Sequence, residues 1–167
     1  MRGEPSLNYS SSALGLQGLG GWLVVVQVAL YITGIQMLLG LVTSSIPNFT
    51  TEVWSVLTSP ESEYYHPMWS NILVFEAIYN VFFLAFVIYI LVLFYQKKSI
   101  VPRLIIVFYS LSLLFLFFNQ LMLSQIPLAQ ELLGEGGFRH VGRALLACAI
   151  WIPYFLRSER VRITFVR

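Results

Sequence analysis

Five polar side chains lie inside long apolar stretches of this 167-residue chain, and they are the residues best placed to do chemistry. One is acidic, one is basic and three are amides: Glu76, Arg143, Gln36, Asn80 and Asn119. A carboxylate, a guanidinium and amides can pair with one another, or they can bind a small polar ligand or an ion. Polar groups are costly in an apolar environment, so these residues mark the region of greatest functional interest.

Signatures of catalysis and of metal binding are missing from the sequence. It contains no Ser-x-x-Lys, His-Glu-x-x-His or Gly-x-Ser-x-Gly pattern and no phosphate-binding loop. All eight acidic residues are Glu, and His66 and His140 are far apart in the chain. Cys148 is the single cysteine, and one thiol forms neither an intrachain disulfide nor a zinc site. We therefore expect no catalytic residue, no metal site and no cofactor, and we predict that the protein is not an enzyme.

The composition favours a membrane protein over a soluble one. Hydrophobic residues make up 57% of the chain and charged residues only 11%, whereas soluble domains contain roughly 45–50% and 25%. A chain of this length cannot bury that much apolar surface in one core. Its net charge of +2 provides no basic stripe for phosphates, so we expect no nucleic-acid partner.

Four stretches with few charges predict four membrane-spanning helices. A helix that crosses about 30 Å of hydrocarbon needs about 20 apolar residues, and its backbone amides must be paired within the helix. The predicted spans are residues 21–42, 72–95, 102–123 and 137–156. We expect Ser44, Ser45 and Pro47 to end the first span. Pro102 suits the first turn of the third, where its missing N–H costs nothing.

The fourth span is the least apolar, because only the 13 residues from Ala144 to Leu156 are free of charge. To span, it must extend back to about Gly137 and take Arg143 into the membrane. Charge placement favours this extension over three spans. Lys and Arg lie mainly in the two tails and between the second and third spans, whereas Glu dominates the other loops. Because Lys and Arg stay on the cytoplasmic side, four spans place both termini in the cytoplasm.

The sequence thus predicts an all-α, multi-pass membrane protein built as a small four-helix bundle. Residues 1–18 would be a flexible cytoplasmic tail, 19–156 the transmembrane domain and 157–167 a basic cytoplasmic tail. In the first outer loop, residues 51–57 could form a short interfacial helix. Four tryptophans occur where the aromatic belts of a membrane protein would lie: Trp22, Trp54, Trp69 and Trp151.

Several motifs resemble one family. They open the first span, fill the outer loop and close the fourth span: Gly18-Leu19-Gly20-Gly21-Trp22-Leu23, Leu57-Thr58-Ser59-Pro60, Tyr65-His66-Pro67 and Trp151-Ile152-Pro153-Tyr154-Phe155-Leu156-Arg157-Ser158-Glu159-Arg160-Val161. Over about Gly18 to Phe165 the chain resembles the YdgK-like family of small bacterial inner-membrane proteins, a domain-of-unknown-function family. Val101, where Phe is expected, and Arg162, where Lys is expected, are mild departures. The resemblance implies a four-span bacterial inner-membrane protein and assigns no activity and no catalytic residue.

Helix geometry places the five intramembrane polar residues in one layer in the outer half of the bundle. Three interpretations are open. Glu76 and Arg143 form an ion pair that neutralises both charges and fixes helix register, with Asn80 and Asn119 as interhelical hydrogen bonds. Alternatively, the layer is a pocket open to the outside that binds a small polar ligand or an ion. In the third interpretation Arg143 extends to the headgroups and pairs with nothing.

Function is the least determined property. We expect a non-enzymatic accessory or scaffold component that lies in the lipid bilayer and binds other membrane proteins or lipids, or associates with itself. The alternative is a small oligomeric transporter or channel with an outward-facing polar pocket around Glu76 and Arg143. Aromatic residues crowd the middle of the spans, which interrupts a polar path and favours the binding role: Phe82, Phe83, Phe86, Phe115, Phe117 and Phe118.

Overall fold

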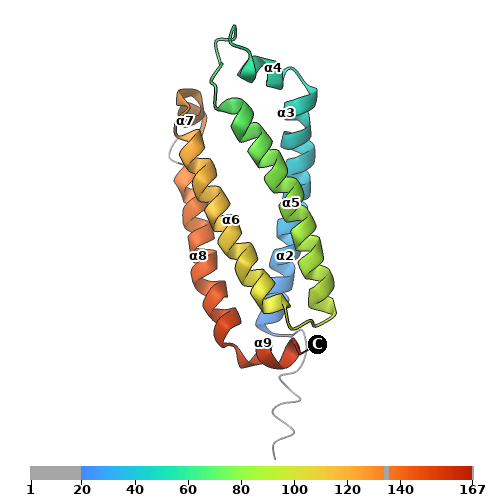
Figure 1. Ribbon diagram of the computed structural model, residues 1–167. Coiled ribbons are helices and arrows are strands. Elements are labelled where there is room, and N and C mark those ends of the chain that lie inside the picture. The colour runs from blue at the N-terminus through green and yellow to red at the C-terminus, as the bar shows by residue number, and fades with distance from the viewer. Residues whose placement is uncertain (1–19, 134–135, 167) are drawn as a thin grey trace, which may run out of the picture.

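The computed structural model describes residues 20–133 and 136–166, and the predicted flexible tail, residues 1–18, lies outside the described residues. In this part of the chain the regular elements are all helices, which confirms the all-α prediction there. Four long rods lie side by side (Figure 1). The elements are α2 (Trp22–Gly40), the π-helical turn η1 (Leu41–Ser45), α3 (Ile46–Thr50), α4 (Val53–Thr58), α5 (Trp69–Tyr95), α6 (Val101–Leu123), α7 (Pro127–Leu133), α8 (Gly136–Arg157) and α9 (Glu159–Thr164).

Three of these helices are long and apolar enough to cross a membrane: Trp22–Thr50, Trp69–Tyr95 and Val101–Leu123. Their length and composition make the chain a membrane protein by physical character. The helix α8 has 22 residues but is not among the three, because Arg139, His140 and Arg143 lie in its first turns. The long rods α5, α6 and α8 begin and end within three residues of the predicted spans.

The first rod is longer than predicted, because the helix does not end at Ser44, Ser45 and Pro47. It continues through η1 into α3 and ends at Thr50. In η1 the N–H of Ile46 donates to the carbonyl of Leu41, five residues back, which is the pattern of a π-helix. A proline removes one N–H from a helix, and a local π turn allows the rod to continue past Pro47 without breaking.

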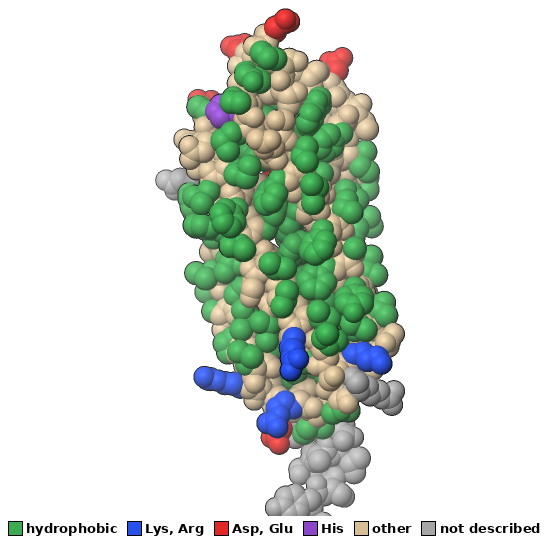
Figure 2. All heavy atoms as spheres, viewed as in Figure 1, with side chains coloured by type: hydrophobic (Ala, Val, Ile, Leu, Met, Phe, Trp, Pro, Cys, Tyr) green, Lys and Arg blue, Asp and Glu red, His purple; other side chains and the backbone are tan. Residues whose placement is uncertain are grey.

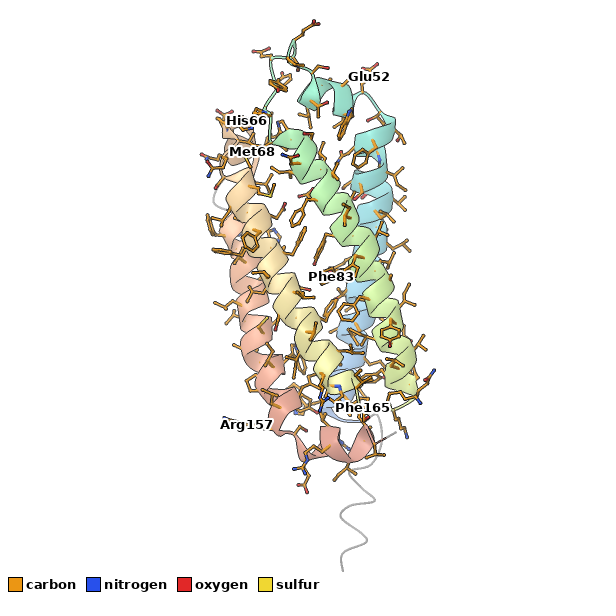
Figure 3. The ribbon with its side chains drawn as sticks, in the orientation of Figure 1. Glu52, His66, Met68, Phe83, Arg157 and Phe165 are labelled. Carbon is orange, nitrogen blue, oxygen red and sulfur yellow. The ribbon has the colours of Figure 1, made fainter. Side chains whose placement is uncertain are left out.

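Two apolar clusters fill the two ends of the bundle. The larger lies in the half that holds the start of α2, the end of α5 and the start of α6. Its fully buried side chains include Leu30, Ile90, Phe94 and Ile105. The smaller lies at the opposite end, where Trp69 and Ile72 of α5 pack against Ile126 and Ala129 near α7. Phe83 lies between the two ends, among the side chains that point into the bundle (Figure 3).

Charged side chains separate between the two ends of the molecule. Figure 2 shows Lys and Arg gathered at one end and Glu mostly at the other, with apolar side chains covering the face between them. We call these the basic end (Lys97, Lys98, Arg103, Arg157, Arg160 and Arg162) and the acidic end (Glu52, Glu61, Glu63 and Glu131). Many apolar side chains on the rods are exposed, as expected for surfaces that face lipid.

The C-terminal segment that follows α8 packs against the bundle. Ser158 caps α9 by accepting a hydrogen bond from the Val161 N–H at 3.4 Å. The helix then runs across the basic end (Figure 1). Val161 and Phe165 are buried there, and the Phe165 ring packs against the Phe94 ring with centroids 5.2 Å apart. The spacing of Val161 and Phe165 by four residues presents both to the bundle.

Two short helices cover the acidic end. The helix α4 occupies most of the stretch 51–57, in which a short helix was expected, and its Trp54 packs on Phe49 with ring centroids 5.1 Å apart. The helix α7 was not predicted. It follows α6 directly and brings Ile126 and Ala129 onto Trp69.

Candidate functional site

A pocket of about 420 Å³ lies among the four long rods, between the two apolar clusters. It is open rather than enclosed, and α2, α5, α6 and α8 all contribute to its lining. Polar groups reach it from every rod: Thr33, Gln36, Tyr79, Asn80, Tyr109, Ser112, His140 and Arg143. Met37, Phe108 and Leu116 complete the lining with two alanines. We call this space the polar pocket.

The wall that α8 contributes is both cationic and open. His140 and Arg143 are three residues apart on one face, and Ala144 and Ala147 follow on the same side. Alanine side chains leave the space that larger residues would fill. Among the described residues, neither His140 nor Arg143 makes a hydrogen bond or an ion pair, and both are exposed. This wall therefore offers donor groups that no described residue satisfies.

The π turn positions the opposite wall. Ser45 of η1 is buried, and its Oγ accepts a hydrogen bond from Asn80 Nδ2 at 2.9 Å. Gly40 lies beside the same amide, since a Cβ at this position would be in ordinary van der Waals contact, 3.9 Å from the Asn80 nitrogen. A π-helix carries an extra residue in its turn, so it rotates the residues that follow it relative to a continuous α-helix. The position of Ser45 against α5 is thus a property of the turn.

Glu76 and Asn119 form a separate pair between α5 and α6. Asn119 Nδ2 donates a hydrogen bond of 2.9 Å to Glu76 Oε1, and both side chains are half-buried. Asn119 Oδ1 is buried and accepts no hydrogen bond from a described residue. Neither residue lines the polar pocket. The pocket that was expected around Glu76 and Arg143 therefore contains Arg143 without Glu76.

The predicted layer of five residues divides into two groups in the structure. Gln36, Asn80 and Arg143 line the polar pocket, while Glu76 bonds to Asn119. No ion pair joins Glu76 to Arg143 in the part of the chain that is described. Asn80 and Glu76 differ by one helical turn, and 3.6 residues per turn rotates them by about 40° relative to each other. That offset directs them to different neighbours.

Five polar lining residues were not among the predicted site residues: Thr33, Tyr79, Tyr109, Ser112 and His140. His140 follows from the sequence once Arg143 is placed, since a spacing of three residues puts both on one helix face. Thr33 and Ser112 carry no distinguishing signal among the many small polar residues of membrane helices. Ser45, which orients Asn80, was taken as the end of a helix, so only the π turn reveals it.

The four tryptophans have different roles. Trp22 and Trp151 meet at the basic end with ring centroids 6.4 Å apart and planes at 70°. Trp54 packs on Phe49 near the acidic end. Trp69 is only 9% exposed and packs in the smaller apolar cluster, to which Ala129 of α7 contributes.

A second junction joins the start and the end of the described chain. Gly21 has a φ of +61°, a conformation that favours glycine, and a Cβ at this position would overlap Arg160 Nη1. The Arg160 guanidinium therefore lies over the backbone that opens α2. Together with the contact of Trp22 and Trp151, this junction brings the opening and closing motifs of the sequence to one place.

Groups of three or more His, Cys or acidic residues that could hold a metal ion do not occur among the described residues. A family model described as "Protein of unknown function (DUF2569)" matches residues 16–166. No curated protein and no solved structure matches the chain.

Proposed function

This chain belongs to the DUF2569 family of proteins of unknown function, and we propose that it is a non-enzymatic component of the bacterial inner membrane that binds an amphipathic molecule of the bilayer in the polar pocket. The proposal includes four membrane spans, cytoplasmic termini and membership of the YdgK-like family. The observation that carries it is a polar pocket, lined from all four rods, that ends against a closely packed apolar core.

The closed floor of the pocket favours binding over transport. Phe108 lines the pocket and also belongs to the larger apolar cluster, whose members Val87, Ile90 and Phe94 have no exposed surface. A channel or transporter needs polar or wet lining along its path. The apolar core occupies the half of the bundle between the pocket and the basic end, so a polar solute has no such path in this conformation.

The position of α8 supports a fourth span. Its 22 residues extend over about 33 Å, and it lies along α6 in Figure 1. Cys148 Sγ contacts the Tyr109 carbonyl oxygen at 3.3 Å, which shows how closely the two rods pack. Arg143 lines the pocket, and an intramembrane arginine that faces a polar cavity costs much less than one that faces lipid.

The charge separation supports the proposed orientation. The basic end holds the loop between α5 and α6 together with α9, and the acidic end holds the loops around α4 and α7 (Figure 2). With Lys and Arg on the cytoplasmic side, the polar pocket lies in the outer half of the bilayer. Because the pocket is not enclosed, an amphipathic molecule of the outer leaflet can enter it.

A pocket-filling substitution tests the proposed function. Ala147 lines the pocket on α8, whereas Ala149 of the same helix is exposed and does not line it. The full chain is purified from its native membrane in mild detergent, and bound small molecules are identified by native mass spectrometry. We expect the unaltered protein and Ala149→Phe to retain a bound amphiphile, and Ala147→Phe to lose it.

Two results would contradict the proposal. The first is equal retention by Ala147→Phe and Ala149→Phe, which would place any bound amphiphile outside the pocket. The second is rapid flux of ions or small solutes through liposomes that contain the purified protein, which would support the transporter alternative. Co-purification of a membrane protein that survives filling of the pocket would indicate a scaffold that acts through another surface.

A further inference from the structure

The polar pocket has a charge that its own lining does not balance. Arg143 contributes a permanent cation, and no acidic side chain among the described residues lines the pocket. Glu76, the acidic residue predicted to lie inside a span, accepts a hydrogen bond from Asn119 and does not line the pocket. Among the described residues Arg143 has no ion pair. An uncompensated guanidinium in an apolar region is costly, and a bound anion would remove most of that cost.

On this basis, and resting on the function proposed above, we infer that the polar pocket selects a ligand with an anionic phosphate group, held by Arg143. Guanidinium and phosphate match in geometry, because two parallel N–H groups can donate to two phosphate oxygens. His140 lies three residues away on the same face and adds a second nitrogen donor. The amide of Gln36 faces them from α2 and supplies a neutral donor.

The surface next to the pocket suits the apolar part of such a ligand. One turn from Gln36 toward the basic end, Ile32 is 51% exposed. On α8, Leu146 and Ile150 follow Arg143 in the same direction and are 64% and 61% exposed. These side chains lie toward the membrane centre relative to the polar lining. A phosphate bound at Arg143 would thus have acyl chains directed along apolar helix surfaces.

The depth of Arg143 distinguishes this site from ordinary contact with bulk lipid. Arg143 lies seven residues inside α8, or about 10 Å from the start of that helix. The phosphate of a bound lipid would be drawn below the level of its neighbours. A site at this depth accepts individual molecules, and its occupancy should depend on headgroup charge more than on chain type.

Two neighbouring arginines provide a matched test. Arg143 lines the pocket, whereas Arg139, one turn earlier on α8, does not. The full chain is placed in nanodiscs of phosphatidylcholine, and fluorescent phosphatidylglycerol or fluorescent phosphatidylcholine is titrated into them. We expect the unaltered protein and Arg139→Gln to prefer phosphatidylglycerol by about tenfold or more. Both lipids carry a phosphate, but phosphatidylcholine also carries a choline cation that Arg143 repels, whereas the phosphatidylglycerol headgroup is a net anion. Arg143→Gln should lose this preference, and Arg143→Lys, which keeps the cation, should retain part of it.

Competition with a soluble phosphate ester tests whether the bound phosphate belongs to a lipid or to a free molecule. Glycerol phosphate is added as a competitor at millimolar concentration. If it leaves lipid binding unchanged, the acyl chains contribute and the ligand is a lipid; if it displaces the lipid completely at low concentration, the pocket is a site for free phosphate esters and the lipid assignment is wrong. Equal affinity of the unaltered protein for the two lipids would overturn the charge selectivity while leaving amphiphile binding intact. Loss of all binding by both Arg143→Gln and Arg139→Gln would also overturn it.

Discussion

Asn80 and Ser45 are joined by a hydrogen bond of 2.9 Å that connects the centre of α5 to the π turn of the first rod. The bond fixes one wall of the polar pocket, because Asn80 lines it and Ser45 is buried behind it. A turn that carries an extra residue is thereby linked to the orientation of a candidate ligand-binding amide.

Removal of this bond should destabilise the bundle modestly. We expect Ser45→Ala to lower the free energy of unfolding by about 0.6–1.7 kcal/mol, the range of interhelical hydrogen bonds in membranes. Ser44→Ala is the control, because Ser44 is exposed and should change stability little. Unfolding by SDS from mixed micelles, followed by circular dichroism, measures the difference. Equal effects of the two substitutions would show that the bond does not contribute.

The pairing of Glu76 with Asn119, rather than with Arg143, can be measured as a coupling energy. A double-mutant cycle of Glu76→Ala and Asn119→Ala should give a coupling of about 1 kcal/mol, since each substitution removes the hydrogen bond between the two side chains. The cycle of Glu76→Gln and Arg143→Gln should give a coupling near zero. The same SDS unfolding assay serves both cycles. A larger coupling to Arg143 than to Asn119 would contradict this pairing and favour an ion pair between Glu76 and Arg143.

Gly21 should tolerate no side chain. Its φ of +61° disfavours other residues, and a Cβ would overlap Arg160 Nη1. We expect Gly21→Ala to lower the temperature of thermal unfolding. The corresponding loss in the free energy of unfolding should exceed about 1 kcal/mol. Gly142→Ala provides the contrast, because a Cβ at that helical position meets nothing within 4 Å. It should be neutral or stabilising by up to about 1 kcal/mol. A transition for Gly21→Ala at or above that of Gly142→Ala would disprove the junction.

The contact of α9 with the bundle predicts an unequal effect of two adjacent substitutions. Phe165 is 5% exposed and packs on Phe94, whereas Val166 is 68% exposed. Phe165→Ala should cost about 3 kcal/mol or more of stability, and Val166→Ala almost nothing. Protease digestion at the C-terminus offers a second measurement, since only Phe165→Ala should release α9. If both variants resist digestion equally, α9 does not depend on this ring.

Membrane topology can be tested with single cysteines, because Cys148 is the one native thiol and is only 7% exposed. In a Cys148→Ala background, an impermeant maleimide applied to intact cells should label Ser62→Cys at the acidic end. It should not label Ser99→Cys or Val166→Cys at the basic end until the membrane is opened. Labelling of Val166→Cys in intact cells would show that α8 does not span.

Hydrophobic length made the long rods predictable from the sequence. The ends of α5, α6 and α8 follow from apolar stretches bounded by charges or by Pro102, and lipid leaves a chain few alternatives to a helix. The end of the first rod was not predictable in this way. Pro47 indicates a break in ordinary helices, and only the neighbouring π turn allows the helix to continue.

The sequence predicts how deep the site residues lie in the membrane, but not which side chains they contact. Counting residues along each span places Gln36, Asn80 and Arg143 at one level, and all three line the polar pocket. Partners depend on how each rod is rotated and on which rods are neighbours, and no periodicity in nearly uniform apolar helices fixes that rotation. For the same reason, the sequence left the partner of Glu76 open, and the structure pairs it with Asn119. The segment of α9 was missed because its arginines resemble a solvated tail, although Val161 and Phe165 lie on one face.

The junction of Gly21 with Arg160 has a consequence for the order of assembly during synthesis. The first rod leaves the ribosome well over a hundred residues before the arginine that covers its opening glycine. Until then the guanidinium that lies over Gly21 is missing, although Trp151 can already pack on Trp22. The contacts of the first rod are therefore completed only when the last helix is synthesised. Translation that stops before α9 yields a membrane-inserted chain whose first rod is still accessible to chaperones or proteases at Gly21.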